Sequence, residues 1–187
     1  MDAQALRGQM QATGLDPAWT YAIIRAESAW MADARSSADA LGLMQLLHGT
    51  ALRIAKVEKI AYAKPDDLFQ PSTNIALGTR YLSRMAQKYN GAPWLASAAY
   101  NAGPAPVERW LAARGTLEPD FFIATIPYRE TREYVARVLA FSVIYDWRMN
   151  SKPLALAQRL PRVGQAYAAP DKDTQRKAVV CPALPKP

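Results

Sequence analysis

The chain has 187 residues and a formal net charge of +7, and half of its residues are hydrophobic while 21% are charged. This composition is that of a globular protein and excludes a disordered chain. No apolar run reaches the ~20 residues of a membrane-spanning helix, and the first ten residues lack the apolar stretch of a secretory signal peptide. Residues 150–187 carry seven Lys and Arg against two Asp and Glu. Most of the excess charge therefore belongs to a basic tail, which gives little support for a nucleic-acid-binding domain.

The N-terminal half is predicted to be helical with one long loop. The first predicted helix covers residues 2–12. Asp16 followed by Pro17 predicts a capped start for a second helix, residues 17–30. Residues 31–41 are small and polar and predict a loop, and residues 43–57 predict a third helix with a mixed apolar face.

The C-terminal half continues the helical pattern. Residues 59–70 predict a loop with a turn at 65–67. Residues 71–89 have apolar side chains at helical spacing, and the following Asn-Gly pair ends the helix. Residues 93–100, 105–113 and 129–149 predict further helices, and residues 121–127 a short apolar segment. Six prolines after residue 150 predict a docked or disordered tail. We therefore expect an all-α fold, with a domain at residues 1–150 and a Pro-rich basic tail at 151–187.

Histidine-based and metal-based chemistry has little support in the sequence. His48 is the only histidine, so a histidine-based triad would need this residue, and no serine motif lies beside it. The single histidine and the single cysteine, Cys181, are far apart, which excludes ordinary zinc spacing. The glycine-rich phosphate-binding motifs are also missing. We expect no cofactor and no metal, which leaves carboxylates, tyrosines and amides as the candidate groups.

Glu27 is the strongest candidate for a catalytic acid. On a helix it would have Ile23, Ile24, Trp30 and Met31 as neighbours. A glutamate among apolar side chains must find a partner or take up a proton, and the resulting rise in pKa suits a general acid near neutral pH. A buried glutamate hydrogen-bonded for structure alone explains the pattern equally well.

Two later segments carry further polar candidates. Tyr100 and Asn101 close a predicted helix, where they could point into a cleft or simply cap the helix end. Glu130 begins the last long helix, where a carboxylate is favoured by the helix dipole. Tyr134 lies one turn further on the same face.

Five ordered segments resemble one enzyme family. They are residues 25–30 (RAESAW), 42–46 (GLMQL), 74–82 (NIALGTRYL), 98–104 (AAYNAGP) and 126–135 (IPYRETREYV). In this order and spacing, from about residue 16 to 153, the chain resembles the catalytic domain of the large periplasmic soluble lytic transglycosylases. The resemblance implies a lysozyme-like α-helical fold, similar to goose-type lysozyme, with a substrate groove.

The resemblance also implies roles for single residues. Glu27 would be the only catalytic acid, becoming a base later in the turnover. The residues that would bind substrate are Ser36, Gln45, Tyr100, Asn101, Glu130 and Tyr134. The chain departs from the family pattern at residues 36–40, where a proline and a glycine are lost and Asp39 is gained, and at His48, where proline is usual. These departures put the rigidity of the loop in question.

The implied reaction is cleavage of the β-1,4 bond between N-acetylmuramic acid (MurNAc) and N-acetylglucosamine (GlcNAc) in peptidoglycan, leaving a 1,6-anhydroMurNAc end. The implied location is the periplasm, and the implied partner is the peptidoglycan glycan strand, with no nucleic acid and no membrane span. Because a signal peptide is missing from the first residues, we expect the chain to be a fragment whose upstream helical superhelix domain lies outside it.

Three alternatives remain open. The first is a lysozyme-like hydrolase in which Asp39 or another carboxylate positions a water molecule. The second is a catalytically silent peptidoglycan-binding or scaffold module. The third is a nucleic-acid binder that uses the basic tail.

Overall fold

The computed structural model describes residues 3–171 and 173–176, which excludes Cys181. Its helices are α1 (Ala3–Thr13), α2 (Pro17–Ser28), α3 (His48–Glu58), α4 (Pro71–Lys88), α5 (Pro93–Ala102), α6 (Pro104–Arg114), α7 (Pro119–Ala124) and α8 (Arg129–Asn150), with short 3-10 helices η1 (Pro65–Phe69) and η2 (Leu156–Arg159). Over the described ranges there are only isolated β-bridges and no strand, so the predicted all-α class is confirmed. None of the described helices is long and apolar enough to cross a membrane.

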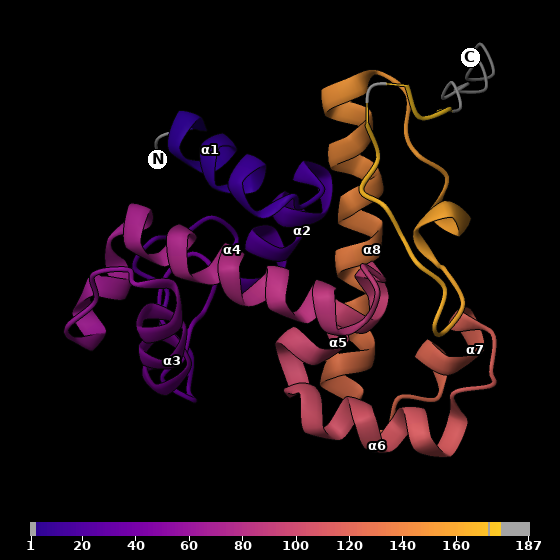
Figure 1. The fold of residues 1–187 in the computed structure, drawn as a ribbon, viewed down its shortest axis with the longest axis horizontal. Helices are drawn as coiled ribbons and strands as arrows, with labels where there is room; N and C mark the ends of the chain where they lie inside the picture. The colour runs from indigo at the N-terminus through magenta and orange to yellow at the C-terminus, as the bar shows by residue number, and fades with distance from the viewer. Residues whose placement is uncertain (1–2, 172, 177–187) are drawn as a thin grey trace, which may run out of the picture.

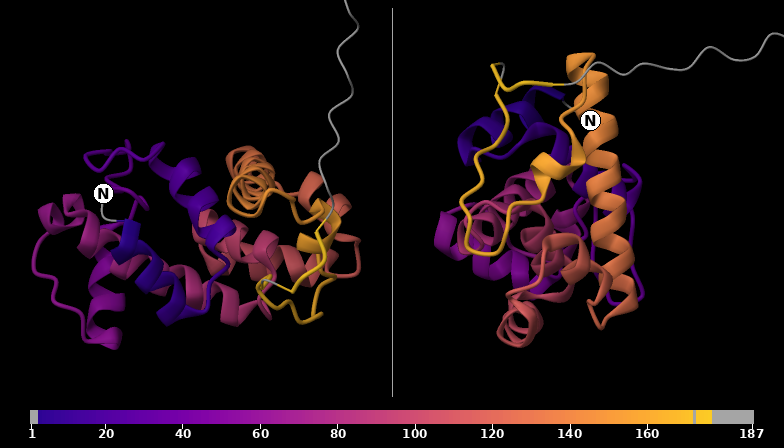
Figure 2. Two further views of the ribbon diagram at one scale, coloured as in Figure 1. Left: turned by 90° about the horizontal axis from the view of Figure 1, so that it is seen from above. Right: turned by 90° about the vertical axis from the view of Figure 1, so that its right-hand side faces the viewer.

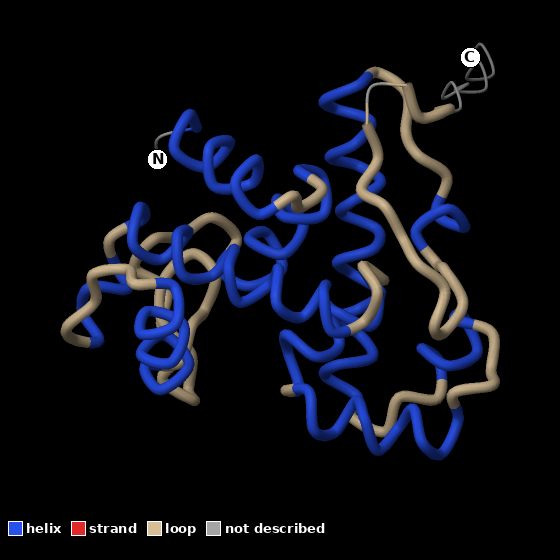
Figure 3. The backbone as a smooth tube through the Cα atoms, in the orientation of Figure 1, coloured by secondary structure: helices blue, strands red, loops and turns tan. Residues whose placement is uncertain are grey.

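The helices form a larger group, α2, α5 and α8, and a smaller group, α3 and η1, and α4 contacts both groups (Figure 1). Helix α2 packs along α8, and α5 packs against both α8 and α4. Helix α3 and η1 lie against α4 on the other side, between long loops (Figure 3). Apolar residues from both groups form one continuous buried cluster. Burial at roughly 25 cal/mol per Å² of apolar surface is what holds such short helices together.

The start of α2 follows its prediction. The Asp16 side chain accepts a hydrogen bond from the Ala18 N–H at 2.9 Å, and Pro17 is the first helical residue. The helix ends at Ser28, because Ala29 adopts the left-handed conformation with φ of 51°. Glu27 is therefore held in the last turn of a capped helix.

The prediction of a helix over residues 43–57 is wrong in its first five residues. Residues 42–46 form a turn, and α3 begins only at His48. The buried Asn74 side chain explains the difference, because it accepts from the Met44 N–H at 2.8 Å and donates to the Leu41 and Leu68 carbonyls. These bonds satisfy backbone groups that a helix would otherwise have satisfied.

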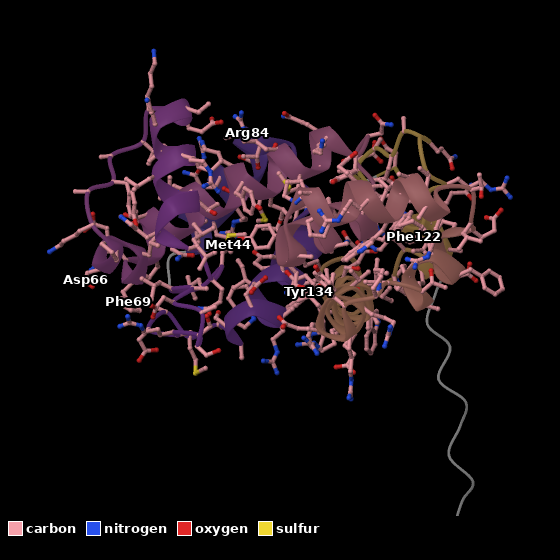
Figure 4. The ribbon with its side chains drawn as sticks, turned by 90° about the horizontal axis from the view of Figure 1, so that it is seen from below. Met44, Asp66, Phe69, Arg84, Phe122 and Tyr134 are labelled. Atoms are coloured by element: carbon pink, nitrogen blue, oxygen red, sulfur yellow. The ribbon has the colours of Figure 1, made fainter. Side chains whose placement is uncertain are left out.

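Two glycines make room for this turn. Gly42 has φ of 74°, and a Cβ there would lie 2.1 Å from the Leu68 carbonyl oxygen. Gly78 of α4 faces Met44, whose Sδ would lie 2.4 Å from an added Cβ. Both substitutions would force the backbone or a buried side chain to move. The turn is therefore pressed tightly onto α4, near the centre of the face shown in Figure 4, where Met44 is labelled.

The described part of the tail packs against the helices rather than extending away from them (Figures 1 and 2). Arg159 is fully buried and forms an ion pair with Asp16, and its Nη2 lies 3.9 Å from Asp146 Oδ1 near the end of α8. The Trp94 indole donates to the Pro161 carbonyl at 2.9 Å. The tail thereby joins α2, α5 and α8, and a domain boundary at residue 150 stays a prediction.

Candidate active site

One cavity of about 420 Å³ gathers most of the predicted site residues. Its lining includes Glu27, Ser36, Gln45, Tyr100, Asn101 and Glu130. Tyr134 does not line the cavity but lies directly behind Glu27. Residues from the 31–47 loop region and from α2, α5 and α8 thus meet at one place, between the two groups of helices.

Glu27 is partly buried, and its surroundings favour the neutral carboxyl. Burial raises its pKa from the ordinary value of 4.5 to about 7, and the nearby charge of Glu130 adds to the rise. The hydrogen bond from Tyr134 and the charge of Arg137 oppose it. A carboxyl with this pKa exchanges its proton near neutral pH, which is the property required of an acid that must also act as a base.

Tyr134 fixes the orientation of the Glu27 carboxyl. Its hydroxyl donates to Glu27 Oε1 at 2.6 Å, and Tyr134, a residue of α8 labelled in Figure 4, is buried. Burial, together with the charge of Glu27, raises the pKa of the Tyr134 phenol well above 10. Because the phenol keeps its proton, it remains a donor to Oε1 and leaves Oε2 for a ligand.

Tyr100 lies beside Glu27, but its hydroxyl donates a hydrogen bond to the backbone of Met44 and not to the Glu27 carboxyl. The bond runs to the Met44 carbonyl at 2.8 Å, and the ring packs on Tyr81 with centroids 5.0 Å apart. Burial raises the pKa of the Tyr100 phenol well above 10, with a further rise from the Glu27 charge. The protonated hydroxyl therefore locks the turn at Met44, and its oxygen can still accept a hydrogen bond from a ligand in the cavity.

Asn101 connects α5 to the start of α8. Its Nδ2 donates to Glu130 Oε1 at 3.3 Å, and its Oδ1 accepts from the Thr131 hydroxyl at 2.6 Å. The residue lies within α5, which ends at Ala102. Asn101 therefore orients the exposed Glu130 carboxylate, in addition to lying in the last turn of α5.

Ser36 and Gln45 make opposite use of their side chains. Ser36 Oγ accepts from the Ala40 N–H at 3.0 Å and from the Ala38 N–H at 3.3 Å, so its own proton can be donated to a ligand. Gln45 Nε2 donates to the Ala34 and Gly42 carbonyls at 3.1 and 2.9 Å. Gln45 therefore braces the loop and presents its amide oxygen as the remaining acceptor.

Asp39 lies outside the cavity lining. Its backbone is left-handed, with φ of 58°, and its carboxylate forms an exposed ion pair with Arg35 at 2.9 Å. It therefore occupies a glycine-like conformation where the family usually has glycine, and its charge is directed to solvent. The departure leaves the Ser36 hydrogen bonds formed.

Sequence reasoning missed several residues of the cavity wall. These are Leu47, Thr50 and Arg53 from α3 and its approach, and Tyr81 from α4. Leu47 was predicted to be helical and is extended. Thr50 and Arg53 are helical as predicted, but local sequence gave no sign that this helix reaches the cavity. Tyr81 lies in the predicted helix of residues 71–89, whose apolar spacing gave no sign of a cavity.

A larger hollow, of about 720 Å³, lies between α1, α2 and the C-terminal part of α8. It is lined mainly by apolar and aromatic groups, including Met10, Tyr21, Trp30 and Tyr145, and contains no carboxylate. The smaller cavity is the better candidate because it joins an acid of raised pKa to several polar groups. No group of three His, Cys, Asp or Glu side chains arranged to hold a metal occurs among the described residues.

Two family models match consecutive parts of the chain. Residues 4–123 match the family described as Transglycosylase SLT domain, and residues 125–153 match the Soluble lytic transglycosylase helical domain. The soluble lytic murein transglycosylase of Escherichia coli K12 is 40% identical over 141 residues, which are 74% of this chain and 22% of the relative.

Solved structures agree with these sequence matches. The lytic transglycosylase Slt of Pseudomonas aeruginosa, solved as an inactive mutant, is 43% identical with a TM-score of 0.78, over 83% of this chain and 25% of that one. The 70 kDa soluble lytic transglycosylase of Escherichia coli is 34% identical with a TM-score of 0.79, over 89% and 27%. The lysozyme-like helical fold is therefore confirmed, and the chain spans about a quarter of the length of these relatives.

Proposed function

The chain belongs to the Transglycosylase SLT domain family, and from this premise we propose that it is a peptidoglycan lytic transglycosylase. The proposed substrate is the β-1,4 bond between MurNAc and GlcNAc. The observation that carries the proposal is the Glu27 carboxyl, held by Tyr134 at 2.6 Å beside a polar cavity and brought to a pKa of about 7 mainly by burial. Because the proposed substrate is part of the cell wall, the proposed location of the chain is the periplasm.

In the proposed first step, protonated Glu27 gives its proton to the oxygen that leaves C1 of the muramyl residue. The C1–O bond breaks as positive charge develops at C1, and the carbonyl oxygen of the muramyl N-acetyl group stabilises that charge. Ser36 supports this step because its hydroxyl proton is free to be donated to the N-acetyl group. Tyr100 offers an acceptor oxygen at the same wall of the cavity.

In the second step, the Glu27 carboxylate takes the proton of the muramyl 6-hydroxyl while that oxygen bonds to C1. The product is a 1,6-anhydro ring, Glu27 is protonated again, and no water is consumed. Glu130 and Asn101 would bind the strand further along the groove, which their coupling across α5 and α8 supports. One carboxyl thus does the work that paired carboxylates do in most glycosidases.

The test is Glu27→Gln against purified peptidoglycan, with Glu133→Gln as the matched control. Glu133 lies exposed on α8 and pairs with Arg129 outside the cavity. Glu27→Gln should abolish turnover, and Glu133→Gln should keep it. Near-normal activity of Glu27→Gln would refute the assigned role.

Mass spectrometry of the wild-type products tests the reaction itself. The proposal requires anhydro ends, whereas mainly reducing ends, heavier by one water, would indicate a lysozyme-like hydrolase. Asp39 gives that alternative little support, because it is engaged by Arg35 outside the cavity lining, whereas Glu130 is a second carboxylate in the lining, so the products decide between the two reactions.

A further inference from the structure

The cavity around Glu27 has an uneven distribution of charge. Its charged lining residues are Glu27, Glu130 and Arg53. Glu130 is engaged by Asn101, and Glu27 by Tyr134. Arg53 is the one cation among these lining residues, so any anion that enters the cavity meets it there.

Arg53 is held in place without being neutralised. Arg53 is exposed, and its Nη2 donates to the Thr50 hydroxyl at 3.0 Å, one turn earlier on α3. No ion pair involves Arg53 in the part of the chain that the structure describes. Two arginines of the neighbouring helix α4 differ, because Arg80 and Arg84 both pair with Glu58, at 3.7 and 2.9 Å.

The charge of Arg53 acts on Tyr81, which lines the cavity together with Tyr100 and Glu27. Burial raises the pKa of the Tyr81 phenol, and the Arg53 charge partly offsets that rise. Tyr81 in turn packs on Tyr100. The guanidinium therefore belongs to the α3 part of a cavity lining that also includes Glu130 of α8.

In the proposed substrate, the anionic groups lie on the peptide stems and not on the two N-acetylated sugars. The two N-acetylated sugars are uncharged, but each muramyl residue carries a peptide stem through its lactyl group, and that stem has free carboxylates. A guanidinium binds a carboxylate through two parallel N–H bonds, which an ammonium cannot reproduce. We propose, resting on the function proposed above, that Arg53 binds a stem carboxylate and makes the site select strands whose stems are present and charged.

The experiment compares two forms of one substrate. Soluble peptidoglycan strands are used as isolated and after carbodiimide coupling of their carboxylates to methylamine, which removes the charge and keeps the stem. Wild type, Arg53→Gln, Arg53→Lys and the control Lys56→Gln are assayed for anhydro products on both. Lys56 is an exposed cation on the same helix but outside the cavity lining, so it reports any general attraction of an anionic polymer to α3.

Wild type should lose up to about tenfold in kcat/KM when the stem carboxylates are coupled, the upper end expected of a charge-assisted hydrogen bond from an exposed guanidinium. Arg53→Gln should be slower than wild type by the same factor on the charged strands and equal to it on the coupled ones. Arg53→Lys should fall between, and Lys56→Gln should behave as wild type.

Two kinds of result would overturn the inference, and they are distinguishable. An active wild type in which Arg53→Gln slows both substrates alike, or neither, or in which Lys56→Gln has the same effect, removes the role of Arg53 alone. A wild type that forms anhydro ends on neither substrate removes the proposed function and this inference together.

Discussion

The raised pKa of Glu27 predicts a pH-dependent stability that Glu27→Gln should abolish. A folded pKa of about 7 against 4.5 means that the folded state holds the proton more tightly than the unfolded state. Stability from this group is therefore greatest below pH 4.5, falls as pH rises, and is fully lost above about pH 7. The shift of 2.5 units, 7 minus 4.5, corresponds to roughly 3 kcal/mol.

Glutamine mimics the neutral carboxyl and can still accept the bond from Tyr134. Glu27→Gln should therefore match wild type at pH 4 and exceed it by up to roughly 3 kcal/mol at pH 8, a rise in Tm of roughly 6–12 °C for a domain of this size. Urea unfolding of both proteins from pH 4 to 9 measures the difference, and contributions from other titrating groups cancel. A variant that is equally stable or less stable at pH 8, after correction for its difference at pH 4, would refute the reasoning.

Three further predictions test the surroundings of Glu27. Tyr134→Phe removes the hydrogen bond that lowers the Glu27 pKa, so the alkaline limb of the kcat/KM profile should move to higher pH. Glu130→Gln removes a charge that raises the Glu27 pKa, so the same limb should move to lower pH. Shifts of the two variants in the same direction would contradict the electrostatic assignment. Asp39→Gly should leave the thermal midpoint nearly unchanged while Asp39→Ala costs about 1 kcal/mol, because φ is 58° there. Arg159→Met leaves the buried Asp16 carboxylate without its ion-pair partner, whereas Asp146 keeps Arg176 at 3.2 Å, so urea unfolding should show a loss of about 3 kcal/mol. An unchanged midpoint would contradict a joining role for the tail.

The longer helices could be predicted from local sequence, since they have apolar periodicity and end signals, whereas α7 was predicted only as a short apolar segment. Asp16 with Pro17 predicted the start of α2, and the apolar neighbours of Glu27 predicted its raised pKa. The turn at residues 42–46 could not be predicted in this way. It depends on Asn74, which lies about thirty residues further along the chain and satisfies the backbone of the turn from a different helix.

The site was predictable only as far as the family resemblance reaches. Periodicity left Glu27 equally compatible with a structural role, and it gave no sign that Tyr134, 107 residues away, donates to it. Arg53 shows the opposite limit, because it lies outside the segments that carry the resemblance. It is helical as predicted, but its place in the cavity depends on how α3 packs against α4, which local sequence does not show.

Helices α2 and α8 are tied together at both ends, which links the tail to the proposed chemistry. At one end Tyr134 donates to Glu27, and at the other Arg159 joins Asp16, the first residue before α2, to Asp146 near the end of α8. The 12 residues of α2 separate the two connections by roughly 16 Å. Since a 2.6 Å hydrogen bond tolerates little displacement, loosening the far connection would lengthen or tilt the bond that orients the Glu27 carboxyl. The described tail is therefore best understood as part of the structure that holds the proposed acid, although it contributes no residue to the lining of the cavity.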